Sequence, residues 1–302
     1  MTLPRRPTPL LLAAGIALAF AACGGTPPPE QPVSEAVLQA EATTERLSAS
    51  DGGKIVLRAI TAHGGLEAWY SAPTSSYTWE YSNAGMNARF KTRVLVDNQT
   101  RMAHHQILTL GTPDSPETYD GRFAWDGENA WIYPADTPTI NPRFWALTGY
   151  YFEQIPFVLA DPGLSYEVLP DEELDGKVYD MVRVGFSTGV GDSPGDTYTL
   201  YVDKQTDVVA AIRYTVTYGR PAPSGDEPNA RPSGETLFLY EDYTTVDGLT
   251  VPGHFMGYNF ADGAVVDFKN EAWCAEISFS QPFDESLLEM PEGARIQPMP
   301  EQ

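Results

Sequence analysis

Residues 76–96, SYTWEYSNAGMNARFKTRVLV, set the pattern that most of the chain follows. Successive side chains of a β-strand point to opposite faces of the sheet, so Tyr77, Trp79 and Tyr81 share one face of an extended segment. Over 88–94, apolar or small residues alternate in the same way with arginine and lysine. This period of two predicts antiparallel strands with one buried, aromatic face and one polar face.

Similar runs continue along the chain, and Asp–Gly pairs, which favour tight hairpin turns, separate several of them. A sheet of about eleven such strands tends to curl. We therefore expect a mainly β (α+β) fold, in which a strongly curved antiparallel sheet forms an unclosed β-barrel. The further predicted strands are 102–110, 122–125, 130–133, 177–186, 197–202, 208–218, 235–243, 254–260, 264–268 and 272–279.

Two helices are predicted before the first strand. Residues 33–47 are rich in alanine and glutamate, and Ser34 is a suitable cap for a helix there. Residues 50–53 are expected to break it. A second helix is predicted over 54–63, followed by Gly64 at the position where a left-handed glycine ends a helix.

At the N-terminus, the stretch IALAFAACGGTPPPEQP (16–32) joins an apolar run to a cysteine and a proline-rich segment. The apolar run is shorter than the about twenty residues of a membrane-spanning helix and suits a secretory signal. Residues 20–23 resemble the lipobox of bacterial lipoproteins. We expect a signal peptide over 1–22, diacylglycerol on the Cys23 thiol, a tether over 23–33 and one domain over 34–302. The alternative is an ordinary signal peptide that leaves Cys23 as a free thiol.

The chain carries 41 acidic and 19 basic residues and a net charge of −22. Nucleic acid and anionic headgroups repel such a protein, so no nucleic-acid partner is expected and charge does not hold the chain at a membrane. Acyl chains on Cys23 would hold it. Gly24 stands where aspartate favours inner-membrane retention in some Gram-negative bacteria. The lipobox resemblance thus implies an exported lipoprotein of the outer membrane that faces the periplasm. Cys274 is then expected to be a buried, unpaired thiol.

Motifs for metals, cofactors and catalysis give no signal: HExxH, CxxC and a phosphate-binding glycine loop do not occur. His104 and His105 are neighbours on a predicted strand and point to opposite faces, so they do not share a metal. His63 is predicted to bond free carbonyls at the end of its helix. The acidic stretch 169–176 is predicted to be a solvated turn. We expect no metal, no cofactor and no enzymatic activity.

A set of ordered motifs between residues 54 and 290 resembles uncharacterised bacterial envelope lipoproteins. Beyond them, the chain is similar to the lipoprotein-localization-factor fold of LolA, LolB and RseB. The resemblance implies an unclosed β-barrel whose apolar hollow holds acyl chains or a hydrophobic partner segment. The motifs are AITAHGGLEAW (59–69), FAWDGENAWIY (123–133), YYFEQIPFVLADPG (150–163), YTLYVDKQTDVVAAIRY (198–214) and YEDYTTVDGLTVP (240–252).

The stretch PRFWALTGYYFEQIPFVLA (142–160) interrupts the strands and predicts a helical insertion in the concave side of the sheet, broken near Pro156. It carries more aromatic surface than one helix face buries, and aromatic residues line pockets for apolar ligands. Core packing is the alternative for the same residues. We expect Trp145 to line the mouth of such a pocket. The candidate ligand-binding residues are Trp79, Trp125, Trp131, Phe144, Trp145, Tyr151, Phe152 and Phe157.

These observations predict a lipid-anchored envelope protein that binds a lipid, a lipopeptide or another hydrophobic ligand in the hollow of the barrel. The alternative is a non-enzymatic scaffold or regulator that docks a protein partner on the concave surface. A hydrolase would need an activated nucleophile or a close pair of carboxylates, which the sequence does not single out.

Overall fold

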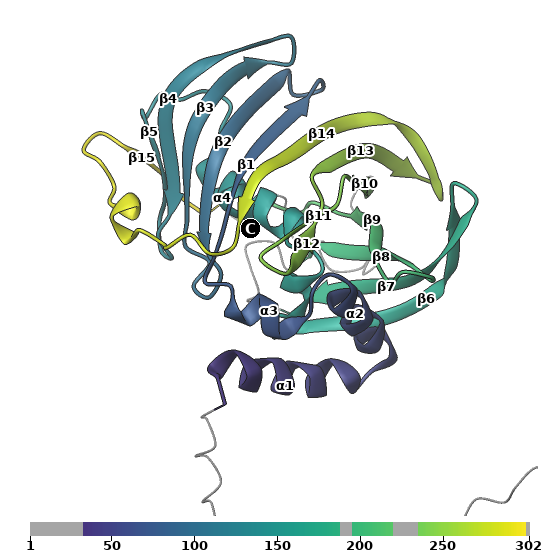
Figure 1. Ribbon diagram of the computed structural model, residues 1–302. Coiled ribbons are helices and arrows are strands. Elements are labelled where there is room, and N and C mark those ends of the chain that lie inside the picture. The colour runs from purple at the N-terminus through teal and green to yellow at the C-terminus, as the bar shows by residue number, and fades with distance from the viewer. Residues whose placement is uncertain (1–32, 188–194, 220–234, 300–302) are drawn as a thin grey trace, which may run out of the picture. The chain divides into compact units, whose positions relative to one another are not determined.

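A computed structural model describes residues 33–187, 195–219 and 235–299. Residues Ser34–Gln302 form one compact unit. Its described part holds a sheet of thirteen antiparallel strands, more than the about eleven expected for a curled sheet. The two edge strands, β6 and β15, do not pair with each other, so the barrel is unclosed as predicted. Figure 1 shows the sheet bent around the helix α4.

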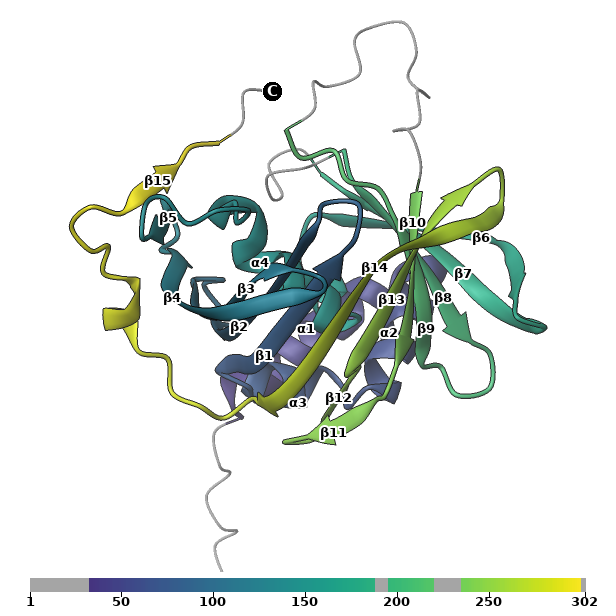
Figure 2. The same ribbon diagram turned by 90° about the horizontal axis from the view of Figure 1, so that it is seen from above.

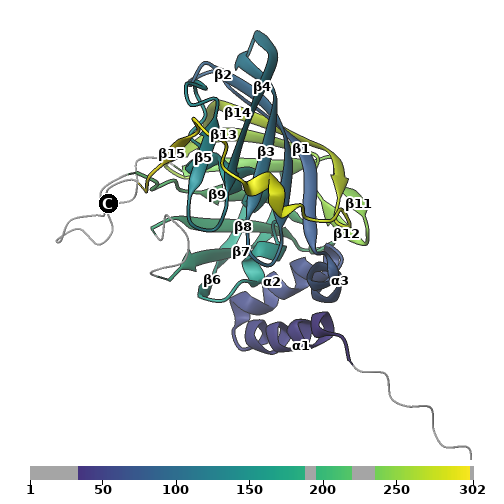
Figure 3. The ribbon, with the colours of Figure 1, turned by 90° about the vertical axis from the view of Figure 1, so that its left-hand side faces the viewer.

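One half of the sheet is a meander at the start of the chain, completed by a strand from its end. In spatial order it contains β15 (Arg295–Gln297), β5 (Ala130–Tyr133), β4 (Ser115–Trp125), β3 (Ala103–Thr112), β2 (Ala88–Asp97) and β1 (Thr74–Asn83). The 3-10 turn η2 (Glu285–Leu288) precedes β15. Figure 3 views this half from its own side, with the N-terminal helices at one end.

The other half begins where β1 pairs with a strand almost two hundred residues later. It contains β14 (Ala264–Ser278), β13 (His254–Ala261), β10 (Glu235–Glu241), β9 (Val209–Tyr214), β8 (Thr197–Asp203), β7 (Lys177–Phe186) and β6 (Leu164–Leu174). A separate hairpin is formed by β11 (Thr244–Val246) and β12 (Leu249–Val251).

The predicted alternation is confirmed in the first hairpin. Tyr77, Trp79 and Tyr81 are all buried, and each faces a buried residue of β2 in the antiparallel register. Two predictions are wrong, that of a solvated turn over 169–176 and that of separate strands over 264–268 and 272–279. The stretch 169–176 is the end of β6 and its turn, because only the Asp–Gly pair at 175–176 takes the left-handed conformation of a tight turn. The predicted strands 264–268 and 272–279 are one strand, β14, with irregular pairing between them.

The N-terminal helices pack at one end of the sheet. They are α1 (Glu35–Ser48), α2 (Asp51–Ala62) and a short α3 (Leu66–Ser71) that the sequence did not predict. Ser34 caps α1 as expected, with its hydroxyl accepting from the Val37 amide at 3.3 Å. The predicted break between the two helices is confirmed, but it is shorter than 50–53, since α1 ends at Ser48, Ser50 caps α2 and Gly53 lies inside α2. A side chain at Gly53 would come within 2.1 Å of the Leu47 carbonyl, so glycine here permits close packing.

The helical insertion is confirmed. Helix α4 (Pro142–Glu153) begins at the cap residue Asn141, and the 3-10 turn η1 (Phe157–Ala160) follows Pro156. Together they connect β5 to β6, and α4 contacts β3, β4 and β5. Figure 2 shows α4 enclosed by the two halves of the sheet.

Cys274 is buried and free, as expected. Cys23 and the predicted signal peptide lie outside the described residues, so the lipid site stays a prediction. Within the described residues, no helix combines the length and the apolar character that crossing a membrane requires.

Candidate functional site

Helix α4 lies along β1, and one turn of the helix spans about the same length as two residues of the strand. The Trp145 ring lies 4.7 Å from the ring of Tyr81, and one turn later a side chain at Gly149 would come within 2.9 Å of the Trp79 ring. Four helical residues advance about 6 Å, close to the about 6.6 Å of two strand residues. The helix therefore runs antiparallel to β1, and Gly149 allows it to lie directly on the indole of Trp79.

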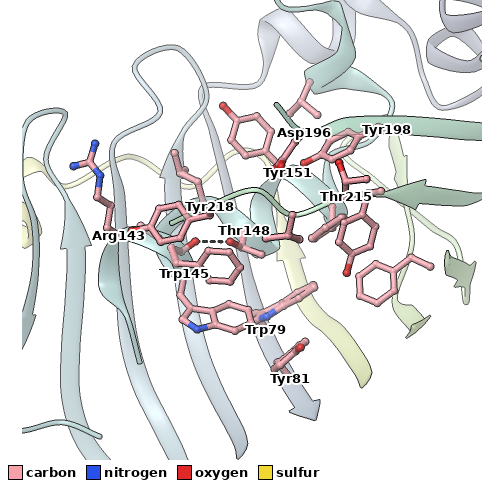
Figure 4. Close-up of a pocket in the computed structure, with 18 of the residues that line it drawn as sticks. Trp79, Tyr81, Arg143, Trp145, Thr148, Tyr151, Asp196, Tyr198, Thr215 and Tyr218 are labelled. Carbon is pink, nitrogen blue, oxygen red and sulfur yellow. Dashed lines mark hydrogen bonds between the residues drawn. The ribbon is translucent and has the colours of Figure 1, made fainter. Parts of the chain in front are cut away.

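A cavity of about 590 Å³ lies beside this helix. Residues Trp79 and Tyr81 of β1 line one side, α4 and η1 another, and strands of the second half a third (Figure 4). Aromatic side chains dominate its wall. They are Trp79, Tyr81, Trp125, Phe144, Trp145, Tyr151, Phe152, Phe186, Tyr198, Tyr214, Tyr218 and Phe238.

Six of the eight predicted ligand-binding residues lie on this wall, and two do not. The indole of Trp131 is fully buried, and its Nε1 donates to the Leu288 carbonyl at 3.2 Å. Phe157 is also buried and stacks on Trp69, with ring centroids 5.1 Å apart. The aromatic wall residues that were not predicted are Tyr81 of β1, Tyr218 after β9, and Phe186, Tyr198, Tyr214 and Phe238 on β7 to β10. The alternation of aromatic residues in 198–214 indicated that these residues share one face of the sheet, but it does not say which strands face α4.

Two stripes of α4 differ in exposure. Trp145 and Phe152 are buried, while Phe144 and Tyr151 are half-buried. Trp145 is only 5% exposed, and its ring centroid lies 4.8 Å from that of Phe90. Trp145 thus lines the cavity and also packs in the core, so its effect on ligand binding relative to folding stays a prediction. Phe144 and Tyr151 are the better probes of the cavity.

The charged side chains on the wall are engaged within the protein. Arg101 holds Asp161 in a bidentate ion pair at 2.8 and 2.9 Å. Burial raises the pKa of Asp161, and Arg101 opposes that rise. Asp196 accepts from the amide and the hydroxyl of Thr217, and the ammonium of Lys269 donates to the Thr236 hydroxyl at 2.6 Å. The wall thus presents mostly ring faces and hydroxyl groups.

His105 fastens α4 to the sheet. Its ring stacks on Phe123 at 4.2 Å, and its Nε2 lies 2.9 Å from the Ala146 carbonyl of α4. Burial lowers the pKa of His105 to about 3, so the ring is neutral at ordinary pH. Nε2 then carries the proton and donates to the carbonyl, while Nδ1 accepts from the Thr92 hydroxyl at 3.1 Å. His104 points to the opposite face, near Asp284.

His63 does not bond the end of its own helix, so that prediction is wrong. Its Nδ1 lies 2.8 Å from the Thr250 carbonyl, and its Nε2 accepts from the Val209 amide at 3.2 Å. Burial lowers its pKa to about 4, so the neutral ring links β12 to the start of β9. His63 bonds strands that are distant in sequence, and the prediction from its position at the end of a helix considered only neighbouring residues.

The expectation that no catalytic motif occurs, G-x-S-x-G included, is wrong for one pattern: GDSPG at 191–195 matches the G-x-S-x-G of hydrolases. That pattern places a nucleophilic serine between a strand and a helix. Here the elements on either side are the paired strands β7 and β8, so the required context is missing. In the part of the chain that the structure describes, no cluster of three His, Cys, Asp or Glu residues could hold a metal.

No family model matches the chain, and no curated protein matches it. The chain is similar to solved structures, among them a LolA superfamily protein from Nitrosomonas europaea, at 10% identity and a TM-score of 0.48, covering 79% of this chain and 97% of the other. A DUF1329 family protein from Desulfovibrio piger covers the same shares at 11% identity and a TM-score of 0.48. The lipoprotein LppX from Mycobacterium tuberculosis, at 14% identity, covers 57% of this chain and 98% of its own, with a TM-score of 0.24. All three structures are less than 15% identical to this chain, with TM-scores below 0.5.

Proposed function

We propose that this protein binds a hydrophobic ligand in the cavity between α4 and the second half of the sheet. The observation that carries the proposal is the cavity itself, about 590 Å³ with an aromatic wall. Pockets for small ligands fall within about 300–1,000 Å³ and combine apolar walls with a few polar groups. Hydroxyls of tyrosine and threonine supply such groups here, so the ligand has an apolar body and a weakly polar end.

We further propose a non-enzymatic role. None of the four histidines lines the cavity. Its two carboxylates, Asp161 and Asp196, are each held by donors of the protein. A general acid or base must lie within hydrogen-bond reach of the proton that it transfers, so its carboxyl group or ring must be accessible to the substrate. A binding protein has no such need.

The proposed location is the bacterial envelope, with acyl chains on Cys23. The order of charge, apolar run, small residues, cysteine and proline-rich tether supports it. An outer-membrane position facing the periplasm follows from the residue after the cysteine. Labelled palmitate should enter the wild-type protein and not Cys23→Ser, and gradient fractionation should find the wild type in the outer membrane.

A fluorescent fatty acid tests the binding proposal directly. It should bind at one molecule per protein, and native mass spectrometry of detergent-free protein should find an apolar molecule that the fatty acid displaces. A protein that is always empty and that takes up no fatty acid would contradict the proposal.

Docking of a protein partner is the second candidate, and one feature favours it. Every residue of the β13–β14 hairpin from 261 to 268 is exposed, including Val266 at 61% and Phe268 at 52%. Lys269 and Asn270, the next two residues, line the cavity, so the hairpin continues its wall. A stoichiometric protein complex without bound lipid, lost in Val266→Ser with Phe268→Ser, would favour docking over ligand binding.

A further inference from the structure

The last residue of α4 is a buried acid. Glu153 is 0% exposed, and among the described residues it forms no ion pair. Its Oε2 accepts from the side-chain amide of Gln154, and its Oε1 has no hydrogen-bond partner. An ionised carboxylate without a paired charge is costly to bury, so this group is neutral in the folded protein.

The groups that face Glu153 are uncharged. They are Tyr77 of β1, Tyr240 of β10, Cys274 of β14 and Tyr150 of α4 itself. The hydroxyl of Tyr240 donates to the Phe152 carbonyl at 3.2 Å, and that of Tyr77 has no partner. Burial raises the pKa of Glu153, and no described cation opposes the rise. An added negative charge would therefore find no described cation beside it, and the side-chain amide of Gln154 as its hydrogen-bond donor.

Glu153 ends the row of contacts that fixes α4 on β1. Trp145 lies on Tyr81, Gly149 on Trp79, and Glu153 follows one turn later beside Tyr77. The same helix supplies Phe144, Tyr151 and Phe152 to the cavity wall. A movement of its C-terminal end would widen the cavity between α4 and the second half of the sheet.

We propose that Glu153 is a protonation latch for α4: the neutral carboxyl lets the helix end lie in the core, and loss of its proton releases that end and opens the cavity. His105 holds the middle of the helix through the Ala146 carbonyl. The released end is thus the turn that follows, together with Gln154. The inference deepens the proposed function, because the cavity that opens is the proposed ligand site.

The direction with pH follows from proton linkage. The seated carboxyl keeps its proton, while the released carboxyl ionises near its ordinary value of 4.5. Each pH unit above that value shifts the equilibrium about tenfold toward release, up to the raised pKa of the seated group. Alkaline conditions therefore favour the open helix, and acidic conditions the seated one.

Hydrogen exchange of the α4 amides tests the latch without any ligand. After correction for the intrinsic exchange rate, opening of 150–154 in the wild type should increase up to tenfold per pH unit between pH 6 and 9. Glu153→Gln keeps the size and the hydrogen-bonding oxygen but cannot ionise, so its opening should not change with pH. Glu67→Gln, an exposed acid of α3, is the matched control and should behave as the wild type. If Glu153→Gln does not fold, Glu153→Leu replaces it.

Release of a bound fluorescent fatty acid separates the two proposals. Its dissociation should accelerate with pH in the wild type and in Glu67→Gln but not in Glu153→Gln. Opening of 150–154 that is independent of pH in the wild type overturns the latch, even if the fatty acid binds. Opening that follows pH in a protein that never binds the fatty acid keeps the latch and overturns the proposed function.

Discussion

The two faces of β7–β10 carry similar residues and reach opposite outcomes. On the inner face, Tyr198, Tyr214 and Phe238 line the cavity. On the outer face, Tyr201, Leu237 and Phe260 form a closed hydrophobic cluster with Tyr179, Met181 and Ala211. The outer cluster is packed closed, with Phe260 of the neighbouring strand β13 only 5% exposed, whereas on the inner face the helix α4 lies over the sheet and leaves a cavity. The difference lies in what covers each face.

A cation completes the outer cluster. The Arg213 guanidinium lies 4.7 Å from the Phe260 ring centroid and 5.5 Å from that of Tyr201. It also pairs with Glu172 at 2.9 Å. An ion pair thus supports the outer face, while on the side of the cavity the ion pair of Arg101 and Asp161 is joined by two neutral titratable groups, His105 of β3 and Glu153 of α4. The predictions below test this contrast.

Phe260→Ala should have the largest effect, because it removes a buried ring from the closed face. We expect a loss of about 3–5 kcal/mol in the free energy of unfolding. Chemical denaturation measures it. Affinity of the folded protein for a fluorescent fatty acid should be unchanged, and a tenfold weaker affinity would mean that the two faces are not independent.

Acid should weaken the attachment of α4 to the sheet through His105 of β3. Its folded pKa is about 3, below the ordinary 6.5, so the unfolded chain gains the proton first and stability is lost as pH falls below 6.5. The loss from this residue is about 1.4 kcal/mol per pH unit down to about pH 3. Denaturation at pH 7 and pH 4.5 should show a smaller difference in His105→Gln than in the wild type. If the wild type and His105→Gln lose the same stability between pH 7 and pH 4.5, His105 does not stabilise the attachment of α4.

Phe144→Ala combined with Tyr151→Ala should separate binding from folding. Both side chains are half-buried on the cavity wall, so the cost in stability should be under about 1.5 kcal/mol for each. Affinity for the fatty acid should fall at least tenfold, about 1.4 kcal/mol. Val168→Ala on the exposed edge strand β6 is the control, and a similar fall there would contradict a specific site.

Glu172→Gln should have the smallest effect. It removes the charge that pairs with Arg213 and accepts from the Tyr201 hydroxyl at 2.5 Å, but it keeps the shape and an accepting oxygen. We expect a loss of about 1 kcal/mol in stability, reduced in high salt because both partners are partly exposed. A salt-independent loss would indicate that packing of the side chain, and not its charge, holds the outer face.

Local patterns in the sequence predicted most of the strands, their apolar faces and the presence of α4, but not the edge strands β6 and β15. Alternation in 76–96 reports which side chains share a face, and Asn141 with Pro142 marks the start of the helix. These signals are local, because they depend on backbone geometry over a few residues. Six wall residues could be named for the same reason: they are large aromatic residues on predicted strands or on the inserted helix.

The way in which these elements meet depends on contacts between distant parts of the chain. The pairing of β1 with β14 joins residues that are far apart in sequence, and no local pattern encodes such a partner. Trp131 is buried away from the cavity, Trp145 is buried on its wall and Phe144 is half-buried there, and these differences depend on which segments pack against each residue. Glu153 looks like an ordinary helical acid in the sequence, and its neutrality follows from the burial that β1, β10 and β14 impose on it. Burial is a property of the assembled fold, because it depends on the packing of distant segments and not on the residue itself.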